Sequence, residues 1–186
     1  MGLKLNLGSG QNPQPGYLNV DKYGNPDFKC DLETFPWPWQ DNSVSEILLN
    51  HALEHLGAAT DVFIGIMKEM FRVCEAGAKI RIVVPHPRHD HFIGDPTHVR
   101  VVTPDMLNLF SKRANLRWRE MHAANSPLAL YHNVDFEVVE ATFSLDEPYA
   151  SEFQAGKISQ EELGVLLKKH NNVATEIQMT LTVIKE

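Results

Sequence analysis

A glycine turn that directly follows a short apolar strand is the feature of this sequence best suited to chemistry. Lys4–Leu7 has the pattern of a strand, and Gly8, Ser9 and Gly10 come immediately after it. Glycine adopts positive φ readily and has no Cβ, so the backbone of such a turn can approach a ligand closely. In open α/β sheets, nucleotide-like ligands bind at the carboxyl end of the opening strand. The turn therefore predicts a cofactor site, with an ordinary tight turn as the alternative.

Histidines and carboxylates are dense in a second segment, between residues 86 and 98. They are His86, His89, Asp90, His91, Asp95 and His98. Such side chains are ligands of zinc and other divalent ions. His89 and His91 are too close in sequence to share one face of a helix, so we assign no metal to this loop. The loop can instead bind a substrate, because loops after strand ends overhang the sites of α/β sheets.

A sheet with covering helices must position these residues, because apolar runs of strand length alternate with segments of helical periodicity. We expect about seven strands from this pattern. They fall at residues 3–7, 17–20, 27–30, 45–50, 79–84, 136–145 and 175–183, and the last two form an antiparallel pair. Only a proline-rich turn, Gln11–Gly16, separates the first two strands, whereas a crossover helix needs about a dozen residues. The first crossover helix must therefore be shortened or replaced by a turn.

Three helices have clear signals in the sequence. A long helix should start near Thr60 and end at Gly77. Its apolar stripe consists of Phe63, Ile66, Met67, Met70, Phe71 and Cys74. A second helix should begin at Pro104 with Thr103 as its N-cap. A third should follow Ser159, since this residue and Glu162 have the spacing of a capping box.

Length and composition bound the class of protein. The 186 residues, 43% hydrophobic and 22% charged, suit a single domain over residues 1–186, with an excursion at about 144–172 between the last two strands. The net charge of -7 disfavours nucleic acid as a partner. The two cysteines, Cys30 and Cys74, lack a metal-type spacing and suit a reduced, cytoplasmic chain. No apolar run approaches the length of a membrane span, so a soluble protein is expected.

Several short motifs, in a fixed order, resemble those of one enzyme family. The segments are Leu5–Gly10, Asn19–Asp21, Asp31–Glu33, Trp39–Ile47, His51–Leu56, Phe71–Ile80 and Gly94–Arg100. Their order and spacing are similar to the class I S-adenosylmethionine (SAM)-dependent methyltransferases, and more narrowly to the type 11 methyltransferase-domain proteins. The resemblance covers most of the chain through about Phe110 and returns weakly in the last strand. It implies a Rossmann-like α/β sheet, mostly parallel with a final antiparallel strand.

The resemblance also implies that SAM is the cofactor and assigns its contacts. Asp21 would accept hydrogen bonds from the two ribose hydroxyls, a role that suits a carboxylate at the end of the second strand. Asp31 and the backbone N–H of Leu32 would contact the adenine. The methionine end would lie against the glycine turn and the end of the fourth strand. The residues expected there are Leu7, Gly8, Ser9, Gly10, Asn50 and His51.

Methyl transfer needs alignment of the acceptor with the methyl group, and a base where the acceptor carries a proton. His51, Asp95 and His98 are the candidate catalytic residues. The acceptor is expected to be a small molecule or sugar-like, and its identity does not follow from the sequence. The pocket could be covered by the His-rich loop, by the excursion at 144–172, or by a second copy of the chain in a homodimer.

Three other functions are compatible with parts of the sequence. A nicotinamide-dependent oxidoreductase would use a related sheet, but Asn12, Pro13 and Pro15 stand where its glycine motif would continue after Gly10. A metal-dependent hydrolase would use the His-rich loop. A cofactor-binding module without catalysis would use the glycine turn alone. Stabilisation by SAM, by a nicotinamide cofactor or by a metal distinguishes the first two from a methyltransferase.

Overall fold

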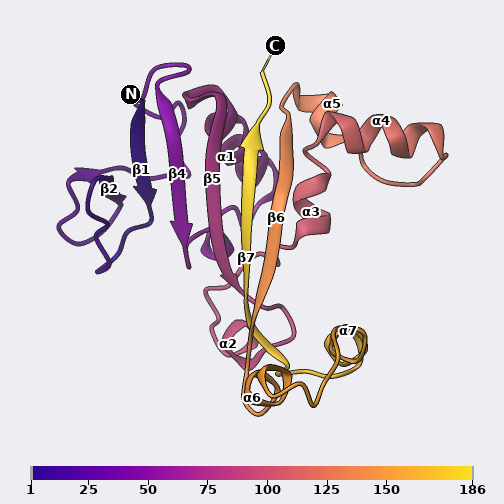
Figure 1. The fold of residues 1–186 in the computed structure, drawn as a ribbon. Helices are drawn as coiled ribbons and strands as arrows, with labels where there is room; N and C mark the ends of the chain where they lie inside the picture. The colour runs from indigo at the N-terminus through magenta and orange to yellow at the C-terminus, as the bar shows by residue number, and fades with distance from the viewer. Residues whose placement is uncertain (1, 186) are drawn as a thin grey trace.

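A seven-stranded sheet organises residues 2–185, which the computed structural model describes (Figure 1). Its strand order is β3-β2-β1-β4-β5-β7-β6. Neighbouring strands from β3 to β5 are parallel, and β7 is antiparallel to both β5 and β6. The strands are β1 (Leu3–Leu7), β2 (Leu18–Asp21), β3 (Phe28–Lys29), β4 (Val44–Asn50), β5 (Cys74–Pro85), β6 (Phe136–Leu145) and β7 (Ala174–Val183). The expected Rossmann-like sheet and its late antiparallel pair are confirmed.

The helices are few and mostly short. They are the 3₁₀ helix η1 (Leu53–His55), α1 (Thr60–Val73), α2 (Asp90–Ile93), α3 (Pro104–Asn108), α4 (Lys112–Glu120), α5 (Leu128–His132), α6 (Tyr149–Gln154) and α7 (Gln160–Lys169). The Oγ1 atom of Thr103 accepts a hydrogen bond from the N–H of Met106 and caps α3 as expected. Ser159 and Glu162 form the expected capping box at α7. No helix among residues 2–185 is long and apolar enough to cross a membrane.

The helices within residues 2–185 cover one face of the sheet (Figure 1). On this face the alternate residues Ile80 and Ile82 of β5 are fully buried, together with Ile66 and Met70 of α1. Edge-to-face contacts between aromatic rings extend this core, for example Phe71 with Phe136 at 5.7 Å between ring centroids. Alternate side chains of each strand therefore point to opposite faces of the sheet. The apolar ones are buried under α1, and the others lie on the opposite face.

The opposite face of the sheet carries none of the described helices (Figure 1), and charged side chains lie across its strands. Glu46 of β4 lies there between Lys4 of β1 and Arg81 of β5, at 2.8 Å and 3.2 Å. One strand further, the ammonium of Lys79 donates a hydrogen bond of 2.7 Å to Thr182 of β7. Cross-strand ion pairs of this kind suit a sheet surface in water.

The first crossover contains no helix, as the proline-rich turn predicted. Residues 11–16 form a turn that two buried asparagines hold against the sheet. The Asn6 amide donates to Asn19 Oδ1 at 2.9 Å, and the N–H of Gln14 donates to the same oxygen at 2.7 Å. Asn19 in turn donates to Asp27 at 2.7 Å. Side-chain hydrogen bonds thus replace the helix that would link β1 to β2.

The boundary between α1 and β5 differs from the expectation. The helix ends at Val73, so Cys74 begins β5 and Gly77 is not its stop signal. Gly77 has φ +80 and lies within β5, where the register against β4 shifts between Val44 and Glu46. The glycine therefore allows the backbone of β5 to depart from regular strand geometry. From the sequence alone, a glycine in this role looks the same as one that ends a helix.

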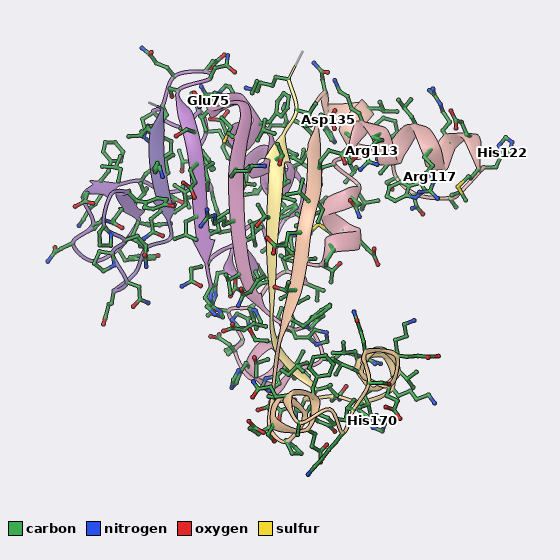
Figure 2. All side chains as sticks on the ribbon, in the orientation of Figure 1. Glu75, Arg113, Arg117, His122, Asp135 and His170 are labelled. Atoms are coloured by element: carbon green, nitrogen blue, oxygen red, sulfur yellow. The ribbon has the colours of Figure 1, made fainter. Side chains whose placement is uncertain are left out.

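Two arms project from the sheet and enlarge the surface (Figure 2). One is α4, with Arg117 and His122 toward its tip; the other consists of α6, α7 and His170. The accessible surface is 10384 Å², whereas a compact chain of this mass exposes about 9,000 Å². The difference agrees with a sheet that is open on one side.

Candidate active site

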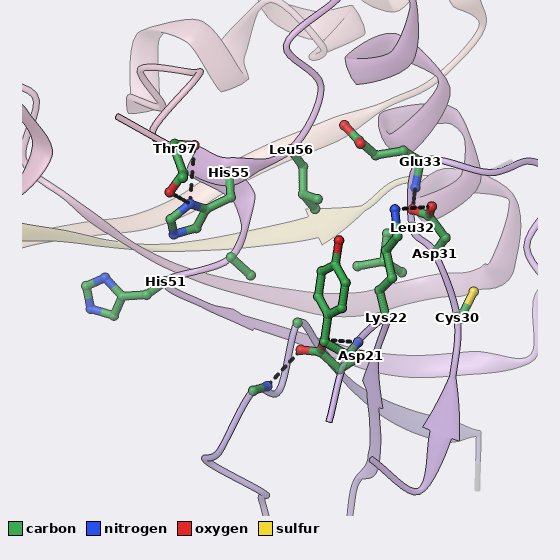
Figure 3. A pocket seen from close by; sticks show the side chains of 14 residues that line it. Asp21, Lys22, Cys30, Asp31, Leu32, Glu33, His51, His55, Leu56 and Thr97 are labelled. Atoms are coloured by element: carbon green, nitrogen blue, oxygen red, sulfur yellow. Dashed lines mark hydrogen bonds and ion pairs between the residues drawn. The ribbon is translucent and has the colours of Figure 1, made fainter. Parts of the chain in front are cut away.

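A cavity of about 530 Å³ opens at the carboxyl ends of β1, β2 and β4 (Figure 3). Strand ends on either side of a reversal in strand order are where open α/β sheets bind ligands, and β1 lies between β2 and β4. Six of the sequence-predicted residues line the cavity, namely Gly8, Gly10, Asp21, Asp31, Leu32 and His51. Cavities of about 300–1,000 Å³ hold ligands of cofactor size.

Asp21, the last residue of β2, is oriented by two backbone donors. Its Oδ2 accepts a hydrogen bond of 2.9 Å from the N–H of Gly10, and its Oδ1 accepts one of 2.8 Å from the N–H of Tyr23. A carboxylate has about four lone-pair sites. The side chain is therefore held in place and can still accept two further hydrogen bonds from a ligand.

Asp31 follows β3 and is held differently, by a charge. Lys22 places its ammonium 2.6 Å from Asp31 Oδ2, and the N–H of Glu33 donates to Oδ1 at 3.1 Å. The hydrogen bond from Lys22, followed by that from Glu33, lowers the pKa of Asp31 below its ordinary value. The ionised form, which only accepts hydrogen bonds, is thereby favoured.

The glycine turn allows close approach, and two of its N–H groups already have acceptors within the protein. A Cβ on Gly8, which has φ +67, would lie 2.6 Å from the Cβ of Ala52. Gly10 has φ +50 with nothing within 4 Å of the same position. The N–H of Ser9 already donates to Val20 at 3.0 Å, and that of Gly10 donates to Asp21. The turn therefore contributes space and the orientation of Asp21.

His51 follows β4 and lies between two carboxylates. Its Nε2 is 2.9 Å from Glu176 Oε1, and its Nδ1 is 3.4 Å from Glu54 Oε1. Glu54 first, and Glu176 after it, raise the pKa of His51 against the opposing effect of burial. The two carboxylates therefore favour the protonated ring more than in an isolated histidine, and they would stabilise a proton that the ring accepts.

Asp95 and His98 do not line the cavity, although their neighbour Thr97 does. Asp95 Oδ1 accepts hydrogen bonds from the N–H and the hydroxyl of Thr97, at 2.8 and 2.6 Å. The ring of His98 is almost buried, and its Nδ1 donates to the carbonyl of Phe92 at 2.9 Å. The loop thus reaches the cavity through Thr97, which contacts His55 Nδ1 at 3.0 Å (Figure 3).

The other predicted residues lie around the cavity without lining it. Leu7 and Ser9 are buried behind the turn, and Asn50 is exposed at the end of β4. No residue of the excursion at 144–172 lines the cavity among the residues that the structure describes. The excursion packs on the His-rich loop instead, where Asn172 Oδ1 accepts from the N–H of Asp90 at 2.9 Å.

Eight residues that line the cavity were not predicted to contact the cofactor. They are Lys22, Tyr23, Cys30, Glu33, Ala52, His55, Leu56 and Thr97. Seven of them are within five residues of a predicted cofactor contact. Their nearness in sequence to the strand ends could therefore have identified them. Glu33 also closes one wall, because its Oε1 accepts a hydrogen bond of 2.8 Å from the N–H of Gly57.

Solved structures with a similar fold include several SAM-dependent methyltransferases. No family model matches the sequence, and no curated protein matches it. A SAM-dependent methyltransferase from Archaeoglobus fulgidus superposes with a TM-score of 0.62 at 16% identity, over 97% of this chain and 86% of that chain. A SAM-dependent methyltransferase from Thermotoga maritima gives 0.54 at 11% identity, over 100% of this chain and 83% of that chain.

A third structure, a SAM-dependent methyltransferase from Mesorhizobium loti, gives a TM-score of 0.50 at 12% identity over 97% of this chain and 90% of that chain. At identities this low, the similarity shows a shared fold, and the function has to be argued from the residues of the site. With its strand order and the antiparallel β7, the chain has the Rossmann-like fold of the class I SAM-dependent methyltransferases.

Proposed function

We propose that this chain is a SAM-dependent methyltransferase that acts on a small-molecule or sugar-like acceptor. The observation that carries the proposal is the Asp21 carboxylate at the end of β2. Two backbone N–H groups orient it beside the glycine turn, and its remaining lone pairs are available at the cavity. A pair of adjacent hydroxyls, as in a ribose, is the ligand group that matches such an acceptor.

The other lining residues suit the rest of this cofactor. Asp31, kept ionised by Lys22, would accept from the exocyclic amine of the adenine, and the N–H of Leu32 would donate to a ring nitrogen. The turn at Gly8 and Gly10 would lie against the methionine end, where side chains are absent. SAM supplies an electrophilic methyl group on a sulfonium when it is bound.

The chain's part in the reaction is alignment and the handling of a proton. Of His51, Asp95 and His98, only His51 lines the cavity, so we assign this role to it. Its Nε2 contact with Glu176 gives a proton a path from the ring to that carboxylate. Thr97 and His55 form the adjoining wall, which the acceptor would contact.

A nicotinamide-dependent oxidoreductase is the main competitor. Enzymes of that kind hold the cofactor's pyrophosphate at the N-terminus of the helix after β1. Here residues 11–16 form a turn in place of that helix, and the N–H groups of Ser9 and Gly10 already have acceptors. These features favour a cofactor that has no pyrophosphate.

The test is the melting temperature of the protein in the presence of each cofactor. A ligand at 100 times its dissociation constant stabilises the folded state by about 2.7 kcal/mol. We expect SAM and its demethylated product, S-adenosylhomocysteine, to raise the melting temperature, and NAD or NADP to leave it unchanged. Stabilisation by a nicotinamide cofactor alone would overturn the proposal. Transfer of labelled methyl groups to a panel of small hydroxyl, amine and sugar compounds would then identify the acceptor.

A further inference from the structure

A cluster of three potential metal ligands lies beside the cofactor cavity. Glu54 and His55 come from η1, and His98 comes from the loop that precedes α3. One carboxylate oxygen of Glu54, one ring nitrogen of His55 and one of His98 lie within 4.8 Å of one another. His55 lines the cavity, whereas Glu54 and His98 lie behind it. The cluster does not include the other histidines of the His-rich loop.

Glu54 is a buried carboxylate without a hydrogen-bond donor. The residue is 0% exposed, and neither Oε1 nor Oε2 has a hydrogen-bond partner. Its contact with His51 Nδ1, at 3.4 Å, involves Oε1 only. Burial of an ionised carboxylate is costly unless it is hydrogen-bonded or coordinates a metal. A group that the carboxylate can bind is therefore expected on its free side, toward His55 and His98.

The hydrogen bonds of His98 leave one ring nitrogen free to bind an ion. Its Nδ1 contacts the carbonyl oxygen of Phe92 at 2.9 Å. A carbonyl can only accept, so Nδ1 carries the hydrogen and the lone pair of the neutral ring is on Nε2. The nearest acidic group to Nε2 is Asp95 Oδ2, at 3.8 Å, which is beyond hydrogen-bond distance.

His55 has the same arrangement, fixed by a chain of two hydrogen bonds. The hydroxyl of Thr97 donates to Asp95 Oδ1 at 2.6 Å, so its oxygen must accept from His55 Nδ1, 3.0 Å away. The hydrogen of His55 is thus on Nδ1, and the lone pair of the neutral ring is on Nε2. Histidines that bind metals usually donate their other N–H to a carbonyl, carboxylate or similar acceptor in this way.

We propose that Glu54, His55 and His98 bind one divalent transition-metal ion, Zn²⁺ by preference. Two imidazole nitrogens and one carboxylate oxygen form a common donor set for zinc that leaves coordination positions open. Bonds of about 2.0–2.2 Å place ligand atoms within about 4.4 Å of one another, which is close to the 4.8 Å limit within which the three ligand atoms lie here. Asp95, next to His98, is the nearest further carboxylate. The site does not depend on the proposed methyltransferase function.

The test is a titration of untagged, chelator-treated and dialysed full-length protein with Zn²⁺, and with Co²⁺ as a spectroscopic probe. We expect one ion per chain, Co²⁺ absorption bands in the visible range, and a higher melting temperature with Zn²⁺. His98→Ala and Glu54→Gln should each weaken binding about tenfold or more. His91→Ala, in the same loop but outside the cluster, is the matched control and should bind as the wild type does.

Three results would overturn the inference. They are no stoichiometric binding of either ion, unchanged binding by His98→Ala, or an equal loss in His91→Ala. Glu54→Gln keeps the shape of the side chain; if it stabilises a protein that binds no metal, a protonated or hydrated carboxylate explains the buried group instead. Far-UV circular dichroism checks that each variant is folded. Stabilisation by S-adenosylhomocysteine is measured separately, so failure of the metal site is distinguishable from failure of the proposed function.

Discussion

The ammonium of Lys22 lies 2.6 Å from the carboxylate of Asp31, and this pair joins the first residue after β2 to the second residue after β3. The neighbouring carboxylate, Asp21, is held by backbone N–H groups alone. The two carboxylates at adjacent strand ends therefore differ in their partners: Asp31 has a cationic side chain, and Asp21 has backbone N–H groups. Asp31 is paired with a cation within the protein, whereas Asp21 has no ion pair among the described residues and faces the cavity.

Lys22→Met should raise the pKa of Asp31. Lys22 is the foremost cause of its lowered pKa, so the carboxylate of the variant should take up a proton at a higher pH than in the wild type. In the wild type this pair stabilises the protein above the ordinary aspartate pKa, and the contribution is lost as the pH falls through the lowered value. A carboxyl-carbon NMR titration measures the change. Lys68→Met, on the exposed side of α1, is the control, and equal pKa values in both variants would contradict the prediction.

Asp21→Ala should weaken binding of S-adenosylhomocysteine by about 1.5–3 kcal/mol, the value of a hydrogen bond to a charged group. This corresponds to about a tenfold to 150-fold higher dissociation constant, which isothermal titration calorimetry measures. Glu140→Gln removes a carboxylate on β6, at the opposite edge of the sheet, and should bind normally. Unchanged affinity in Asp21→Ala would remove Asp21 from the proposed site.

Gly8→Ala should destabilise the fold more than Gly10→Ala. Both glycines have positive φ, which costs other residues about 1–2 kcal/mol. Only at Gly8 does the added Cβ meet another atom, the Cβ of Ala52 at 2.6 Å, and such overpacking costs about 1–3 kcal/mol more. Urea denaturation gives the free energies of unfolding. Equal losses in the two variants would mean that the contact with Ala52 relaxes without cost.

Arg72→Met should lower the free energy of unfolding by about 2–4 kcal/mol, because it leaves a nearly buried carboxylate without its charge partner. Arg72 lies 2.6 Å from Glu69, which also accepts a hydrogen bond from the N–H of Trp37. Arg113→Met is the matched control, since Arg113 is exposed beside Glu137 and an exposed ion pair contributes little to stability. Thermal and urea unfolding compare the two, and equal losses would contradict the argument from burial.

The strands of the sheet could be predicted from the sequence because their periodicity reports directly on burial. In β7 the buried residues Ile177, Met179 and Leu181 alternate with polar neighbours, and the structure places them on the face under α1. Gly77 shows the limit of this reasoning. A glycine after an apolar stripe satisfies the pattern of a helix stop and also that of a strand irregularity, and only pairing with β4 decides between them.

The surroundings of His51 could not be predicted, because its partner Glu176 is 125 positions away in sequence. Only the antiparallel insertion of β7 beside β5 brings the two together. The His-rich loop was misleading for a related reason. His89 is buried and lies 3.1 Å from Asp146, so part of the histidine density serves packing against the excursion. A high number of histidines in one stretch of sequence does not reveal which of their rings lie in the same site.

The sheet face that carries no helix has a thermodynamic consequence. Side chains such as Lys79, Arg81 and Gln178 are already hydrated in the folded state, so unfolding exposes little new apolar surface on that face. Exposure of apolar surface is what raises the heat capacity of the unfolded chain. The heat capacity increment per residue should therefore fall below the usual value of about 12–15 cal/mol/K. The free energy of unfolding of the protein should therefore change only gradually with temperature, which gives a broad stability curve.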